Sequence, residues 1–100
     1  GRYELGAQRY PNARRARAAL DLIGRQRGAR AGTMAGIGAV VVVLGPGGRN
    51  YSDVWWRRGS LLLRASAYAS RLAPLPLDDR RALALALDRR AAAAMALAPA

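Results

Sequence analysis

The chain has 100 residues, which limits it to one small domain with a modest core. All seventeen basic residues are Arg and only six residues are acidic, so the net charge of +11 predicts a polyanionic environment: RNA, an anionic lipid surface or acidic neighbouring subunits. The absence of Cys excludes disulfides and thiolate metal sites, and the absence of His and Lys removes the usual groups for acid-base catalysis.

Residues 1–30 form a basic N-terminal segment with eight Arg and two acidic residues. Asn12 is a suitable cap for a helix from about Ala13 to Ile23, in which small and apolar residues share one side. Such a helix either binds phosphates or presents a solvated face with ordinary ion pairs. Since the chain begins at Gly1 and not at Met, we interpret it as a processed product or a fragment.

Residues 31–48 contain no charge, although nearly a quarter of the chain is charged. A helix over this stretch is roughly 27 Å long, which is near the lower limit for crossing a hydrocarbon core of about 30 Å. Arg30 and Arg49 bracket it and can extend their guanidinium groups to the two interfaces. We predict a membrane-embedded helix here, with a helix-packing face made of Gly32, Gly36 and Gly38.

Two other structures compete for this stretch: a buried helix of a soluble protein, and a strand. The β-branched run from Ala39 to Leu44, followed by the turn sequence GPGG, is typical of a buried strand. We favour the helix because no other segment is predicted to be a strand that could pair with it. Nucleotide-binding motifs are excluded, because Val41 replaces the third Gly of a dinucleotide fingerprint and GPGGRN lacks the Lys-Ser/Thr of a phosphate loop.

Residues 49–73 are predicted to form an amphipathic helix that Ser52 or Asp53 caps. Arg57, Arg64 and Arg71 lie seven residues apart, which on a helix makes one narrow stripe opposite a wide apolar face. Such a helix suits a membrane interface, and the alternative is an ordinary helix whose Trp residues pack in a protein core. The residues assigned to the interface or to anion binding are Arg30, Arg49, Trp55, Trp56, Arg57, Arg58, Arg64 and Arg71.

Residues 74–100 are predicted to form an Ala-rich C-terminal helix. Pro74 and Pro76 precede it, Asp78 is a suitable cap, and the following Ala, Leu and Arg have high helix propensity. The Leu residues at positions 83, 85 and 87 point in different directions, so the helix has no strong apolar face.

The sequence therefore predicts an all-α fold with little independent core. It predicts no catalytic residue, cofactor or metal site, because the acidic residues are better suited to helix caps and ion pairs. The favoured function is a non-catalytic accessory subunit of a larger membrane complex, of the energy-transducing respiratory or photosynthetic kind. Its expected partners are the other subunits and anionic lipid headgroups, and its expected location is an organellar inner membrane or the plasma membrane of a G+C-rich bacterium. The alternative is a small basic RNA-binding or ribosomal protein.

Overall fold

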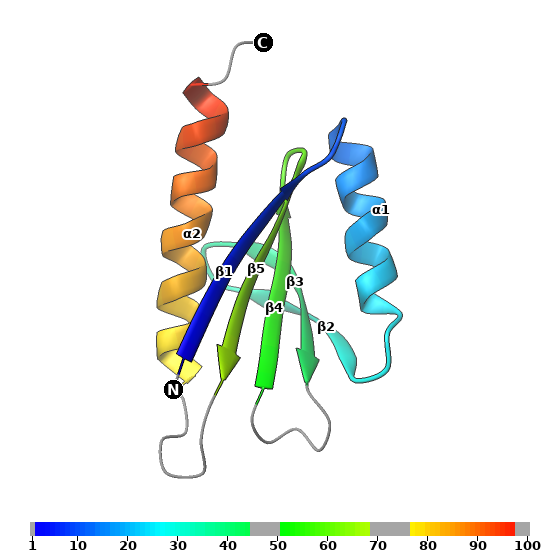
Figure 1. Cartoon of the computed structure of the whole chain (residues 1–100), viewed down its shortest axis with the longest axis vertical. Helices are drawn as coiled ribbons and strands as arrows, with labels where there is room; N and C mark the ends of the chain where they lie inside the picture. The colour runs from blue at the N-terminus through cyan, green and yellow to red at the C-terminus, as the bar shows by residue number, and fades with distance from the viewer. Residues whose placement is uncertain (1, 45–50, 69–76, 98–100) are drawn as a thin grey trace.

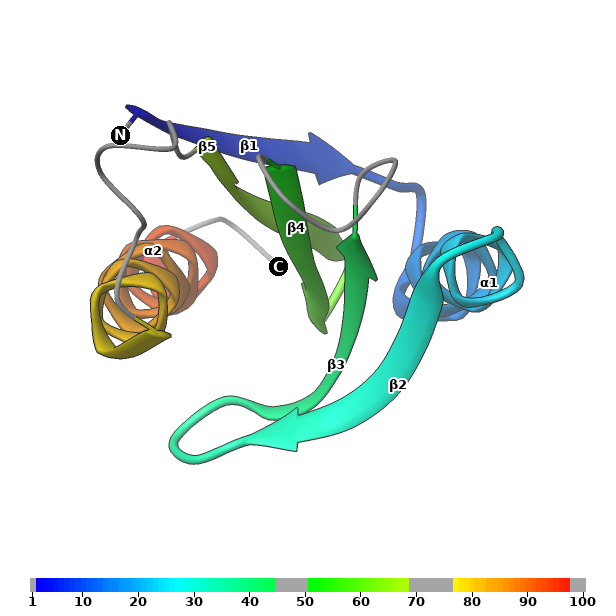
Figure 2. The ribbon, with the colours of Figure 1, turned by 90° about the horizontal axis from the view of Figure 1, so that it is seen from below.

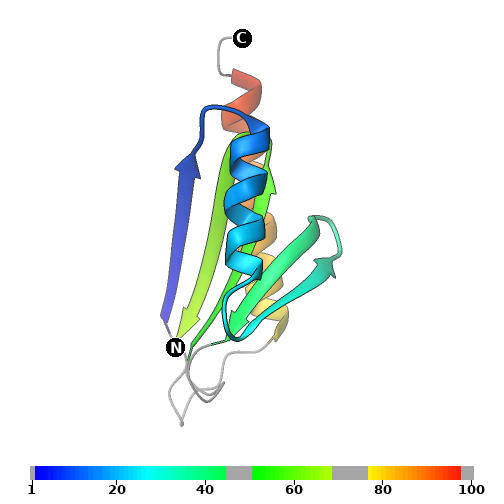
Figure 3. The ribbon, with the colours of Figure 1, turned by 90° about the vertical axis from the view of Figure 1, so that its right-hand side faces the viewer.

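In the described part of the chain, strands contain more residues than helices do. The computed structural model describes residues 2–44, 51–68 and 77–97, and these contain five strands and two helices. In chain order the elements are β1 (Arg2–Arg9), α1 (Ala13–Gly24), β2 (Ala29–Met34), β3 (Gly38–Leu44), β4 (Tyr51–Arg58), β5 (Leu61–Tyr68) and α2 (Leu77–Leu97). The strands form one antiparallel sheet in the order β1-β5-β4-β3-β2, with α1 against one face and α2 against the other (Figures 1 and 3).

The predicted all-α fold is therefore wrong, and so is the membrane-embedded helix over residues 31–48. Residues 29–44 form the β2–β3 hairpin, and Val41 of β3 pairs with Trp55 of β4. β-Branched Val residues fit the pleated surface of a sheet, and the missing partner strand lies in the segment that was predicted to be helical. Gly36 lies in the hairpin turn with a φ of 87°, a conformation that Gly adopts without steric cost.

The amphipathic helix predicted over residues 49–73 is also wrong, because β4 and β5 form a second hairpin there. Arg58 pairs with Leu61, so only Gly59 and Ser60 lie in the turn. Gly59 has a φ of 57°, which fits the first central position of a type II′ turn, a type that suits the twist of paired strands.

Helix α2 packs on the sheet face that carries most of the core. The sheet supplies Val54, Trp56 and Leu63, among others, and α2 supplies the small residues Ala84 and Ala91. The sheet curls around α2, and the turn of the β2–β3 hairpin reaches its side (Figure 2). The predicted C-terminal helix is confirmed, and its small inward residues let it lie close to the strands.

Helix α1 packs on the opposite face and crosses from the edge strand β1 to the edge strand β2. The predicted helix and its cap are confirmed, since the side chain of Asn12 accepts a hydrogen bond of 2.9 Å from the backbone N–H of Arg15. Ala16 is fully buried, and Val41 and Leu62 lie buried on the strands beneath. The structure thus has three layers, with α1 and α2 outside and the sheet between them.

The described helices do not include one that combines the length and the apolar character needed to span a bilayer. The transmembrane helix expected from the sequence is corrected accordingly. The GPGG sequence, Pro74 and Pro76 lie outside the described residues.

Gly32 and Gly36 provide a direct test of the hairpin. A Cβ added at Gly32 meets nothing within 4 Å, whereas at Gly36 it would lie 2.7 Å from Cδ2 of Leu85, on a backbone with positive φ. We expect Gly36→Ala to destabilise the protein by about 1–2 kcal/mol, chiefly through the positive φ because the Leu85 side chain can rotate away. Gly32→Ala should leave stability unchanged or slightly raised. Urea unfolding of both variants measures this, and an equal loss at Gly32 would contradict the hairpin.

Candidate anion-binding surface

The sequence Trp55-Trp56-Arg57-Arg58 lies along β4, where consecutive side chains point to opposite faces of the sheet. Trp56 and Arg58 point to the α2 face, whereas Trp55 and Arg57 point to the α1 face. These four residues therefore do not form the single membrane-interface cluster that was predicted. Each pair has a different environment.

Trp56 and Arg58 bind the carboxylate of Asp88 on α2. The indole N–H of Trp56 donates to Oδ1 at 3.0 Å, Nε of Arg58 donates to the same oxygen at 3.1 Å, and Nη2 of Arg58 donates to Oδ2. Trp56 and Asp88 are buried, while the Arg58 side chain is 44% exposed. The hydrogen bond to Asp88, and then its charge, raise the pKa of the Arg58 guanidinium above its ordinary value. Trp56 is thus a core residue, and Asp88 is an ion-pair partner, as the sequence analysis expected of the acidic residues, although its two partners were not predicted.

Trp55 and Arg64 lie side by side on the α1 face, because they pair directly across β4 and β5. The guanidinium carbon of Arg64 lies 5.6 Å from the centre of the Trp55 ring, which is a cation–π distance. Both side chains are half-buried. Of the predicted anion-binding residues, these two and Arg57 share one face of the sheet.

Arg residues from all three layers lie at one end of the molecule. β1 ends there and the β4–β5 turn lies beside it, since the N–H of Tyr10 donates to the carbonyl of Ser60 at 2.9 Å. Helix α1 begins at this end, and α2 passes it just beyond the Asp88 contact (Figure 1). We call this surface the basic end; it consists of Arg9, Arg14, Arg15, Arg57, Arg58, Arg89 and Arg90.

The acidic residues lie away from the basic end, with one exception. Glu4 and Asp53 flank Ser66 near the other end of the strands, and Asp78 and Asp79 are in the first turn of α2. Asp21 lies on the third turn of α1, and Asp88 is buried against Arg58. The basic end therefore carries a concentrated positive charge, to which the N-terminus of α1 adds its helix dipole.

The other predicted site residues do not join this surface. Arg30 lies on β2, while Arg49 and Arg71 fall outside the described residues. Gly32 and Gly38 lie in strands and Gly36 in a turn, so their assignment to a helix-packing face is corrected with the fold. The sequence analysis assigned Arg9, Arg89 and Arg90 to no site, and it gave phosphate binding as one of two alternatives for the helix that carries Arg14 and Arg15. Only the fold brings them together.

A cleft of about 430 Å³ separates α1 from the β2–β3 hairpin. Leu20, Ala31 and Val41 are among the apolar residues of its lining, and Asp21 and Arg25 are its charged residues. In the described part of the chain, no group of three or more His, Cys, Asp or Glu residues could hold a metal ion. The basic end is the stronger candidate because its chemistry defines a ligand class, namely an anion with several phosphate or carboxylate groups.

Comparison with known proteins gives no family, because no family model, no curated protein and no solved structure matches the chain.

The Asp88 contact can be tested by removing the carboxylate. We expect Asp88→Ala to lower the free energy of unfolding by about 2 kcal/mol, because the buried indole N–H of Trp56 loses its acceptor and Arg58 loses its charged partner. Asp88→Asn keeps one acceptor oxygen, so its free energy of unfolding should decrease less. Urea unfolding followed by Trp fluorescence measures both. The control Asp21→Ala, at an exposed position of α1, should change stability little; an equal loss there would argue against a special role of Asp88.

Proposed function

We propose that the protein is a non-catalytic nucleic-acid-binding protein, with RNA as its ligand, and that the basic end binds the phosphate backbone. The observation that carries this proposal is the separation of charge. Seven Arg from three layers surround one end, and the acid beside them, Asp88, is buried and paired with Arg58. Guanidinium groups bind phosphates through two parallel hydrogen bonds and stay charged at any physiological pH.

The net charge of +11 supports a polyanionic ligand in two ways. It accelerates encounter with a polyanion, and it favours a complex in which bound counterions are released from the phosphate backbone. These effects depend on Arg side chains being exposed. In the basic end the side chains of Arg9, Arg14, Arg15, Arg57 and Arg58 are all exposed, as are those of Arg89 and Arg90.

A nucleic acid suits this surface better than a lipid surface does. Elements that lie in a membrane interface present large apolar side chains next to their basic residues. Among the described residues, the exposed large hydrophobic side chains are Leu5 and Leu22, at 47% and 62% exposure, and neither lies at the basic end. Leu5 is in the middle of β1, and Leu22 is near the C-terminal end of α1.

The expectation of an accessory subunit in a membrane complex stays an untested prediction. That prediction depended on a spanning helix and on Trp residues at the membrane interface. In the structure the uncharged stretch contributes to the β2–β3 hairpin, and Trp56 is in the core. We therefore give preference to the RNA-binding alternative that the composition already suggested.

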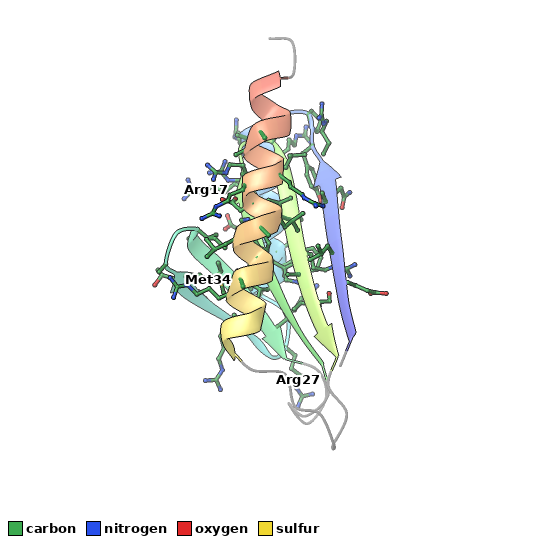
Figure 4. All side chains as sticks on the ribbon, turned by 90° about the vertical axis from the view of Figure 1, so that its left-hand side faces the viewer. Arg17, Arg27 and Met34 are labelled. Atoms are coloured by element: carbon green, nitrogen blue, oxygen red, sulfur yellow. The ribbon has the colours of Figure 1, made fainter. Side chains whose placement is uncertain are left out.

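The proposal is tested by two triple variants with the same change in net charge. One variant replaces Arg9, Arg14 and Arg57 with Gln, and the control replaces Arg25, Arg27 and Arg30, of which Arg27 lies toward the opposite end of the molecule (Figure 4). Binding of a labelled RNA oligonucleotide is measured by fluorescence anisotropy at several salt concentrations. We expect the slope of log Kd against log salt concentration to fall by about 2 for the first variant, because each of the three lost phosphate contacts to a single strand contributes about 0.7. The control should keep most of the original slope.

An equal decrease of the slope in both variants would show that binding depends on the total charge of the protein and that the basic end is not the site. Anionic lipid vesicles serve as the competing ligand. Binding to vesicles without binding to RNA would refute the proposal and would favour anionic lipid as the ligand.

A further inference from the structure

We propose that Arg64, held over the ring of Trp55 and next to Gly6, forms a stacking platform for one unpaired base of a bound nucleic acid. The inference rests on the proposed function and makes it more specific. It assigns the ligand as a single-stranded segment whose phosphates contact the basic end. It also gives roles to three residues on the strands β1, β5 and β4.

The platform is built by the register of three neighbouring strands. Gly6 of β1 pairs with Arg64 of β5, and Arg64 pairs with Trp55 of β4, so the three residues lie in one row on the α1 face. The guanidinium carbon is 5.6 Å from the centre of the indole ring. On the other side, a Cβ placed on Gly6 would lie 3.4 Å from both Nε and Nη2 of Arg64. The guanidinium group therefore lies against Gly6, where a Cβ would make an ordinary van der Waals contact and a longer side chain would compete for the same space.

The platform is accessible in part, because Trp55 and Arg64 each keep some exposed surface and β1 lies beside α1, not behind it (Figure 3). Figure 3 shows α1 in front of the sheet, with β1 to one side of it and the β2–β3 hairpin to the other. Arg64 and Trp55 are half-buried, and Gln8 on β1 is exposed. Within the described residues, Arg64 forms no ion pair, so its charge is not neutralised by a protein carboxylate.

The platform adjoins the basic end on one side and acidic residues on the other. Arg57 lies diagonally across the strands from Arg64, since Arg57 pairs with Leu62 two residues away. Diagonal neighbours are about 7–8 Å apart, which lets one nucleotide contact both residues. In the next row away from the basic end lie Glu4, Ser66 and Asp53, of which Asp53 is buried and accepts a hydrogen bond from Oγ of Ser66.

An unpaired base is required because a duplex keeps its bases stacked inside. Bases that are splayed out stack on aromatic rings and on guanidinium planes, and this contact tolerates any sequence because each base has a π face. Trp55 contributes by limiting the motion of Arg64 and by stabilising its charge. The ring is also a natural reporter, because Trp56 is buried and should respond little to a ligand.

The test compares single-stranded and double-stranded RNA of equal length with the full chain. We expect the single strand to bind more tightly and to quench the fluorescence of Trp55, and a Trp55→Phe variant should lose most of this quenching. Arg64→Gln should weaken binding of the single strand about 5-fold or more, the lower range for one stacked base, and should affect the duplex much less. Gly6→Leu should have the same selective effect by occupying the space beside the guanidinium. Its matched control is Gly32→Leu, also in a strand but with open space around it.

The outcomes separate the two proposals. Equal binding of both RNAs, with no effect of Arg64→Gln and no quenching of Trp55, would overturn the platform and leave the RNA-binding function intact. Absence of binding to either RNA would overturn both. Circular dichroism checks that each variant is folded, and Arg64→Gln at its half-buried position keeps the test decisive if Gly6→Leu fails to fold.

Discussion

The attachment of α2 to the sheet depends on one buried carboxylate. Apart from partly buried Leu side chains, α2 offers the sheet the small residues Ala84 and Ala91, which bury little apolar area, so apolar contact alone defines its position weakly. Asp88 lies between them and accepts hydrogen bonds from Trp56 and Arg58. These bonds fix the position of α2 along the strands and its rotation about its own axis. A buried carboxylate without partners is strongly unfavourable, whereas one with three donated hydrogen bonds selects a single arrangement. This arrangement also brings Arg89 and Arg90 to the basic end.

Strand β4 connects this structural contact to the candidate site. Because side chains alternate along a strand, Trp56 and Arg58 bind α2 while Trp55 and Arg57 remain on the other face. Two adjacent Trp and two adjacent Arg thus supply one structural pair and one pair for binding. A shift of the β4 register by one residue would exchange the two pairs, and Asp88 opposes such a shift because it would lose its donors. The stability of the core and the geometry of the binding surface are therefore coupled through one strand.

Local signals in the sequence sufficed for the helices but not for the strands. Asn12 and the Ala-, Leu- and Arg-rich C-terminal region predicted α1 and α2, because caps and helix propensity act within a few residues. The strand at residues 39–44 was kept as an alternative but not favoured, because no partner strand was predicted. Its partner, residues 51–58, was predicted to be a helix from the spacing of Arg57 and Arg64. A spacing of seven marks one side of a helix, but across a two-residue turn it also places both residues on one face of a hairpin. The Gly-Ser turn and the alternation in Tyr3 to Gln8 were the available strand signals.

The basic end could not be derived from the sequence, because its Arg residues belong to three separate stretches. The topology brings them together: α1 must begin where β1 ends, and β1 ends beside the β4–β5 turn because β1 pairs with β5. A high Arg content alone can follow from the codon usage of a G+C-rich genome, and it would then be spread over the surface without regard to the acidic residues. The distribution of the acidic residues is the stronger argument. Glu4 and Asp53 lie toward the end that also carries Arg27 (Figure 4), and the one acid at the basic end, Asp88, is buried and paired with Arg58. Codon usage does not explain that separation, whereas binding of a polyanion at one end does.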